Sequence, residues 1–69
     1  MKLQDTMKER RKTLSLSQND LAEMADLSLA TIKGIERGKG NPSIATVSRI
    51  IEVLGMEIIY RVRNTITEE

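Results

Sequence analysis

Apolar residues recur at helical spacing along most of this chain, and near its end they change to alternation. The spacing predicts four helices, from about Leu3 to Leu14, from Gln18 to about Ala25, from about Ser28 to Glu36, and from Ile44 to Leu54. Met56, Ile58, Tyr60 and Val62 then alternate with mostly charged residues, which is the period of a β-strand. The pattern therefore predicts a mainly α domain over residues 1–55, a strand over residues 56–63 and a frayed tail over residues 64–69.

Residues 18–37 form two short amphipathic stretches joined by a tight turn, which predicts a helix-turn-helix. Ser17 and Ser28 precede these helices, and Ser43 precedes the last one, where a hydroxyl can accept from an unpaired first-turn backbone N–H. Apolar side chains would fill the crossing of the two helices, namely Leu21, Ala25, Leu27, Ile32 and Ile35, with Ala22 small enough for close approach. Such a motif can place its second helix in the major groove of DNA.

The outward face of that second helix consists of Ser28, Leu29, Ala30, Lys33 and Gly34. Leu29 and Ala30 can make only apolar contacts with base edges, above all with thymine methyls. Ser28 and Lys33 can donate hydrogen bonds, and lysine prefers the acceptors of guanine. Gly34 costs about 1 kcal/mol against alanine inside a helix, and it removes bulk either beside DNA or beside a neighbouring helix.

The residues from 37 to 42 predict a loop after this helix. Gly38 is placed for the left-handed residue that ends a helix, and Pro42 disfavours helix just before Ser43. Arg37, Lys39 and Asn41 would then lie at the height of the DNA backbone. We expect them to contact phosphates, and the alternative is a solvated basic loop.

Arg11 lies on the apolar stripe of the first helix with Leu3, Met7 and Leu14. An unpaired guanidinium in such a place would be very costly, so Arg11 requires a carboxylate partner. The other basic residues of this helix are expected mainly at the solvated surface, with phosphate contact as the alternative; they are Lys2, Lys8, Arg10 and Lys12.

The run SQNDLAEMADLSLATIKGIERGKGNPSIATVSRIIEVLG, residues 17–55, resembles the Cro and phage-repressor-like helix-turn-helix family, often called XRE-like. The most telling pieces are Ser17-Gln18 with Leu21-Ala22, the segment from Ile35 to Lys39, and Asn41-Pro42-Ser43 before another helix. One departure is Asp26, where the family's turn often carries glycine; aspartate tolerates a left-handed backbone better than most other residues.

This resemblance implies a compact four-helix, lambda repressor-like DNA-binding domain. It implies that Gln18 touches the DNA backbone at the N-terminal turn of its helix, and that Arg11 pairs with Glu36 near the end of the recognition helix. The expected activity is that of a sequence-specific transcriptional repressor.

Composition narrows the chemistry further. The 69 residues include no cysteine and no histidine, which excludes disulfides, zinc fingers and thiol or imidazole catalysis and argues against an enzyme. No metal or other cofactor is expected. No apolar run approaches the ~20 residues of a membrane span, so the expected location is cytoplasmic, without a membrane partner. The net charge is only +1, but basic residues cluster in residues 1–16 and 28–55, where they can attract phosphates.

A lone edge strand would leave a row of backbone groups unpaired, so residues 56–63 are expected to pair with the same segment of a second subunit. Met56, Ile58, Tyr60 and Val62 would then form the dimer interface. The segment from Leu54 to Glu57 is similar to the dimer-forming end of HipB-like antitoxins. That likeness implies an alternative function, the neutralisation of a HipA-like kinase toxin combined with autoregulation.

Overall fold

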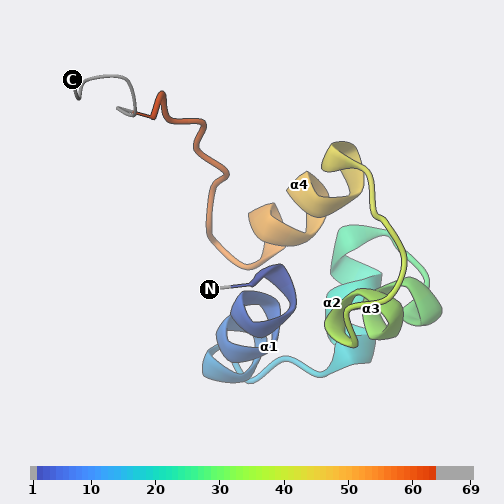
Figure 1. Ribbon diagram of the computed structural model, residues 1–69. Coiled ribbons are helices and arrows are strands. Elements are labelled where there is room, and N and C mark those ends of the chain that lie inside the picture. The colour runs from blue at the N-terminus through green and yellow to red at the C-terminus, as the bar shows by residue number, and fades with distance from the viewer. Residues whose placement is uncertain (1, 64–69) are drawn as a thin grey trace.

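The computed structural model describes residues 2–63, and within that range the chain forms four α-helices. They are α1 (Leu3–Thr13), α2 (Gln18–Ala25), α3 (Leu29–Glu36) and α4 (Ile44–Val53). The bounds differ from the predicted ones by at most one residue at each end. The mainly α, four-helix fold with a helix-turn-helix is therefore confirmed (Figure 1).

Serine hydroxyls start three of the helices. Ser17 Oγ accepts from the Asp20 backbone N–H, and the Asp20 carboxylate accepts in return from the Ser17 N–H, both at 2.9 Å. The hydrogen bonds to Ser17 lower the pKa of the Asp20 carboxyl. Ser28 and Ser43 accept in the same way from the N–H groups of Thr31 and Thr46, at 3.1 Å. All three predicted caps are present, which fixes where α2, α3 and α4 begin.

Left-handed residues set the turns between helices. Asp26 ends α2 with φ 58° and ψ 48°, so aspartate does occupy the position where glycine is common in the family. Gly38 follows α3 with φ 75°, as predicted, and its N–H donates to the Ile35 carbonyl at 2.9 Å. Ser15 is also left-handed, with φ 57°, a feature that no sequence pattern predicted.

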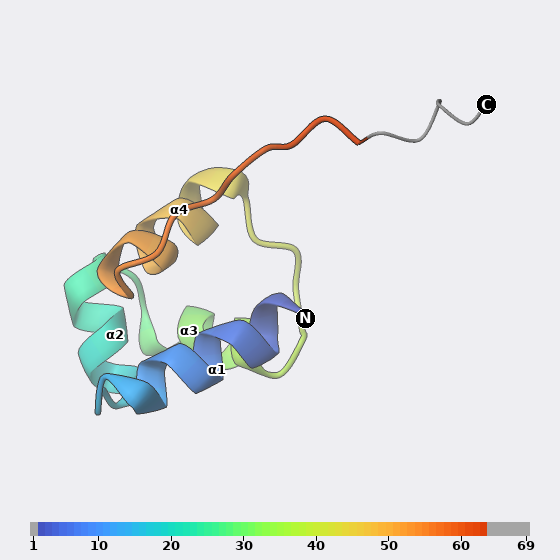
Figure 2. The ribbon, with the colours of Figure 1, turned by 90° about the vertical axis from the view of Figure 1, so that its left-hand side faces the viewer.

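The core lies where α1 and α4 pack on the crossed pair α2 and α3 (Figures 1 and 2). Its fully buried large side chains come from all four helices and the residue after α4; they are Met7, Leu21, Ile32, Ile50 and Leu54. Ala22 and Ala25 supply the small side chains at the helix crossing. The core is wholly aliphatic, as the scarcity of aromatic residues requires.

Two apolar residues of the predicted helices, Leu14 and Ile44, are exposed. Leu14 is 39% exposed because α1 ends at Thr13 and the left-handed Ser15 turns the chain, so that Leu16 packs on the core instead. Ile44 is 66% exposed because it is the first residue of α4, and the buried residues of that helix, Ile50 and Ile51, lie toward its other end. Helical periodicity identified the face in both cases, but not how far neighbouring elements cover it.

Residues 56–63 contain no strand in this single chain, so the predicted strand is not found. Met56 packs against the core, and its N–H donates to the Ile51 carbonyl at 3.0 Å. Beyond it the segment leaves the helices on the α4 side, away from α3 (Figures 1 and 2). The frayed tail predicted for residues 64–69 lies outside the described residues. Among residues 2–63, no helix is both long enough and apolar enough to cross a membrane.

Candidate nucleic-acid interface

The outward face of α3 is largely free of contact with the rest of the described chain. Ala30 and Lys33 are exposed, and Leu29 and Gly34 are half-buried. The Ser28 hydroxyl caps the helix and lies 2.8 Å from the Thr31 hydroxyl, so it already has two partners. The structure therefore groups the predicted base-contacting residues on one side of a short helix, with Lys33 as their one positive charge.

A buried ionic network lies at the C-terminal end of α3, on the side opposite its outward face. Arg11 Nε donates to Glu36 Oε2 at 2.8 Å, and Arg11 Nη2 donates to Glu36 Oε1 at 3.0 Å. Arg11 Nη1 donates to the Leu16 carbonyl at 2.9 Å. The side chains of Arg11 and Glu36 are only 11% and 2% exposed, respectively. This two-pronged geometry fastens the end of α3 to α1 and to the connector before α2.

The protonation of this network follows from its contacts. Burial alone would raise the pKa of the Glu36 carboxyl, but hydrogen bonds from Arg11 and Gln18, together with the charges of Arg11 and Lys8, outweigh it and lower the pKa. The hydrogen bonds to Glu36 raise the pKa of Arg11 despite its own desolvation. Glu36 is thus held as a carboxylate at neutral pH.

Gln18 has an internal partner that the sequence did not indicate. Its Nε2 donates to Glu36 Oε1 at 3.1 Å, so the first residue of α2 joins the network at the end of α3. The side chain is half-buried rather than fully outward. Any contact of Gln18 with a DNA phosphate would therefore be made by a side chain whose position Glu36 already restricts.

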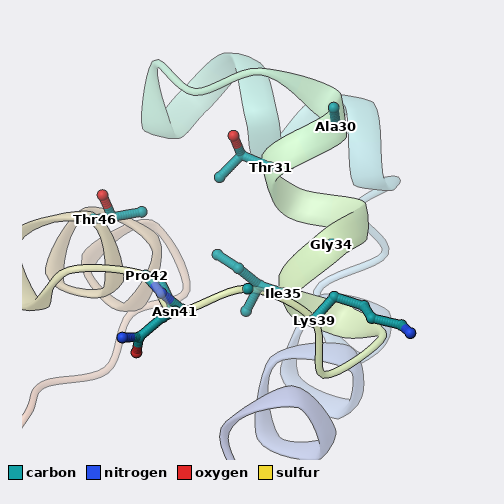
Figure 3. A pocket seen from close by; sticks show the side chains of 9 residues that line it. Ala30, Thr31, Gly34, Ile35, Lys39, Asn41, Pro42 and Thr46 are labelled. Carbon is teal, nitrogen blue, oxygen red and sulfur yellow. The ribbon is translucent and has the colours of Figure 1, made fainter.

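The loop after α3 carries the other predicted phosphate contacts. Arg37, Lys39 and Asn41 are all exposed. The Lys39 N–H donates to the Gly34 carbonyl at 2.8 Å, which ties the loop to the last turn of α3. Figure 3 shows the Lys39 side chain extending away from Asn41 and α4, so these polar groups spread along the edge of the interface.

A hollow of about 330 Å³ separates α3 from the start of α4. Ala30, Thr31, Gly34 and Ile35 line it from α3, and the loop residues from Lys39 to Pro42 and Thr46 line it from the other side (Figure 3). No pattern in the sequence indicates this hollow. It depends on how α3 and α4 are placed relative to each other, which no local pattern encodes.

Residues 7–60 match the family described as Helix-turn-helix. The chain belongs to that family. A transcriptional regulator of the helix-turn-helix type from Methanothermobacter thermautotrophicus, described as uncharacterized, is 40% identical over 53 residues, which cover 77% of each chain. The immunity repressor protein of Bacillus phage phi105 is 40% identical over 48 residues, which are 70% of this chain and 33% of the repressor. The expected resemblance is confirmed, and the chain is a DNA-binding regulator rather than an enzyme.

The residues predicted to join two copies of this helix-turn-helix protein lie apart from α3. Met56 is half-buried against the core, and Ile58 lies at the edge of a smaller hollow beside Ile51 of α4. Tyr60 and Val62 are 78% and 94% exposed. The structure thus separates the outward face of α3 from an apolar segment beyond α4 (Figure 1).

Proposed function

We propose that this chain is a sequence-specific repressor that binds a roughly palindromic operator as a homodimer, with α3 in the major groove. The observation that carries the proposal is the two-sided construction of α3. Its inner end is fixed by the Arg11–Glu36 pair, while Ala30 and Lys33 on its outer face have open space before them. A rigid helix with an open, weakly basic face is what major-groove recognition requires.

The assignment of roles follows from position and chemistry. Leu29, Ala30 and Gly34 offer only apolar or backbone surface, so in the proposed complex base hydrogen bonds come from Lys33 and from the Ser28 hydroxyl. Arg37, Lys39 and Asn41 flank the helix and contact phosphates, and Gln18 does so at the start of α2. Phosphate contacts set orientation, and base contacts set sequence preference.

In the proposed dimer, pairing of two copies through residues 56–63 supplies a second α3, which meets the second half-site of the operator. In the proposed dimer, a two-fold axis brings Ile58, Tyr60 and Val62 of one subunit against the same residues of the other, in antiparallel strands. Two recognition helices related by that axis meet successive major grooves about 34 Å apart. The exposed apolar side chains of the segment support this arrangement, because water is an unfavourable environment for them.

Neutralisation of a toxin is a second proposal for the same segment. An exposed apolar strand-like stretch also suits a protein partner of another kind, such as a HipA-like kinase. A kinase-like reading frame beside this one, and a purified complex of the two products, would support it. A phage lysis or integrase gene in that place would favour the repressor without a toxin.

The proposed roles separate in a DNA titration. Lys33→Ala should weaken binding by about 1 to 3 kcal/mol at a site that has been selected from random duplexes. It should leave binding to scrambled DNA nearly unchanged. Arg37→Ala and Lys39→Ala should weaken both DNAs and each reduce the salt slope by about one. Arg49→Ala removes the same charge from the exposed surface of α4, outside α3, its loop and residues 56–63, and serves as the control. If Lys33→Ala weakened binding to both DNAs equally, Lys33 would not be a base-contacting residue.

A further inference from the structure

Gly34 has no internal reason to be glycine. It lies inside α3, where glycine is less favourable than alanine because it has more backbone freedom to lose. Among residues 2–63, a Cβ built at this position meets no atom within 4 Å. Of the two interpretations that the sequence left open, close packing against a neighbouring helix is therefore wrong. The space that Gly34 leaves is open to something outside the chain.

The hollow beside Gly34 is apolar for a specific reason. Both threonines that line it have their hydroxyl oxygens turned toward capping serines, since Thr31 Oγ1 lies 2.8 Å from Ser28 Oγ and Thr46 Oγ1 accepts from Ser43 Oγ at 3.1 Å. Figure 3 shows their methyl carbons directed into the gap between α3 and α4. With Ala30, Gly34 and Ile35 on the α3 side, these methyl groups give the hollow an apolar wall.

Charge identifies the class of ligand that meets this wall. The charged side chains exposed on α3 and its loop are Lys33, Arg37 and Lys39, and all are positive. The one acid of α3, Glu36, is buried and neutralised by Arg11. An apolar hollow bordered by positive charge suits a polyanion with apolar groups on its surface, and the apolar group that a DNA major groove presents is the thymine 5-methyl.

We infer that Gly34 is a specificity-determining residue whose missing side chain admits a thymine methyl into the mouth of the hollow, next to Ala30. This inference rests on the proposed function, because it requires α3 to lie in the major groove. It assigns a preference for one base, thymine, to a residue that has no side chain. A methyl group added to the protein at this point competes for the space that the methyl group of the base occupies.

The experiment replaces each thymine of a selected binding site, one at a time, by deoxyuridine, which removes only the 5-methyl. For the parent protein, the replacement of one particular thymine in each half-site should weaken binding about fourfold, which is the free energy of burying one methyl group expressed as an affinity ratio. Gly34→Ala should bind the thymine duplex about tenfold more weakly than the parent, through overpacking. With that variant the deoxyuridine duplex should bind more tightly than the thymine duplex, which reverses the sign seen with the parent.

Stability provides the independent control. Gly34→Ala should melt at a higher temperature than the parent, because the added methyl meets no neighbour and alanine favours helix. Thr13→Ala improves helix propensity at an exposed position of α1, outside both hollows and outside the residues proposed to contact DNA or a second subunit, and it should leave both duplexes bound as the parent binds them. A Gly34→Ala variant that melts lower than the parent, or that shows the parent's deoxyuridine effect unchanged, would overturn the inference while leaving DNA binding intact. A parent protein that selects no duplex at all would overturn the proposed function itself.

Discussion

The helical body, residues 2–55, and the segment from 56 to 63 both carry large apolar side chains, with opposite results. In the body, Met7, Leu21, Ile32 and Leu54 are completely buried, and no buried side-chain nitrogen or oxygen among the described residues lacks a hydrogen-bond partner. In the segment, Tyr60 and Val62 remain open to solvent beyond the anchored Met56. The body buries most of its large apolar side chains within the chain, whereas the segment leaves its own exposed, and this exposure is why we propose a partner for it.

This difference predicts two kinds of stability. Interactions inside the body contribute equally at every protein concentration. Pairing of two segments is a bimolecular reaction, so its contribution grows with concentration by mass action. A substitution can therefore be assigned to one region or the other by measuring thermal unfolding over a wide range of protein concentration.

The largest effect is expected from the Arg11–Glu36 pair in the body. Removing one partner leaves the other charge buried without compensation, which typically costs about 3 to 5 kcal/mol. Arg11→Ala and Glu36→Ala should thus melt far below the parent at every concentration. Arg49→Ala is the matched control, since its pair with Asp26 at 3.2 Å is exposed and should contribute about 0 to 1 kcal/mol. Similar melting of the two arginine variants would contradict the structural role of Arg11.

The stability of the protein, measured by unfolding at a series of pH values, provides a second test of the same pair. Because the pKa of Glu36 is lowered in the folded state, its contribution to stability is complete above the unfolded pKa near 4.5 and is lost as pH falls through the folded pKa. Glu36→Gln should remove that part of the acid sensitivity. The part due to Asp20, whose pKa is also lowered, should remain.

Sequence was sufficient wherever the signal was local or carried by a close resemblance. Ser17, Ser28 and Ser43 marked three helix starts, and the resemblance pointed to Glu36 as the partner of Arg11, where the structure places it. The roles of the predicted DNA contacts stay predictions. The sequence did not reveal partners that are backbone carbonyls, or contacts that depend on how whole helices are placed, because neither is marked by a residue type or a spacing.

Arg10 is the clearest example of such a partner. It was expected at the solvated surface, but its Nε donates to the backbone carbonyl of Leu54 at 2.8 Å, across 44 residues of sequence. Every residue has a carbonyl, so no residue type indicates that this one is available. The same limit hid the Gln18–Glu36 hydrogen bond and the hollow beside Gly34, which depend on the relative placement of whole helices.

A smaller effect, of the opposite kind, is expected from the segment. If residues 56–63 pair as strands, alternate residues share a face, so Ile58→Asp would place a charge in the interface and Ile59→Asp would not. We expect Ile58→Asp to dissociate the dimer, to abolish the concentration dependence of melting, and to weaken operator binding. The measurements are light scattering and operator titration.

Truncation after Glu57 complements the point variants, because it keeps Met56 on the core and removes the exposed residues beyond it. The shortened chain should stay folded but monomeric. Equal effects of Ile58→Asp and Ile59→Asp would contradict the strand register. A truncated chain that remains dimeric would show that the interface lies elsewhere.

The smallest expected effect is a gain in the stability of the body at the turn between α2 and α3. Asp26 has a left-handed backbone, which costs a residue with a side chain about 1 to 2 kcal/mol relative to glycine, and less for aspartate, which tolerates this conformation. Asp26→Gly removes that cost and loses only the exposed pair with Arg49. The net gain should be about 0.5 to 1 kcal/mol, a rise of several degrees in a domain of this size, independent of protein concentration. Asp26→Asn removes the charge and retains much of the tolerance, whereas Asp26→Ala loses both and should melt below the parent. If Asp26→Gly and Asp26→Asn melt equally far below the parent, the pair with Arg49 outweighs the backbone at this turn.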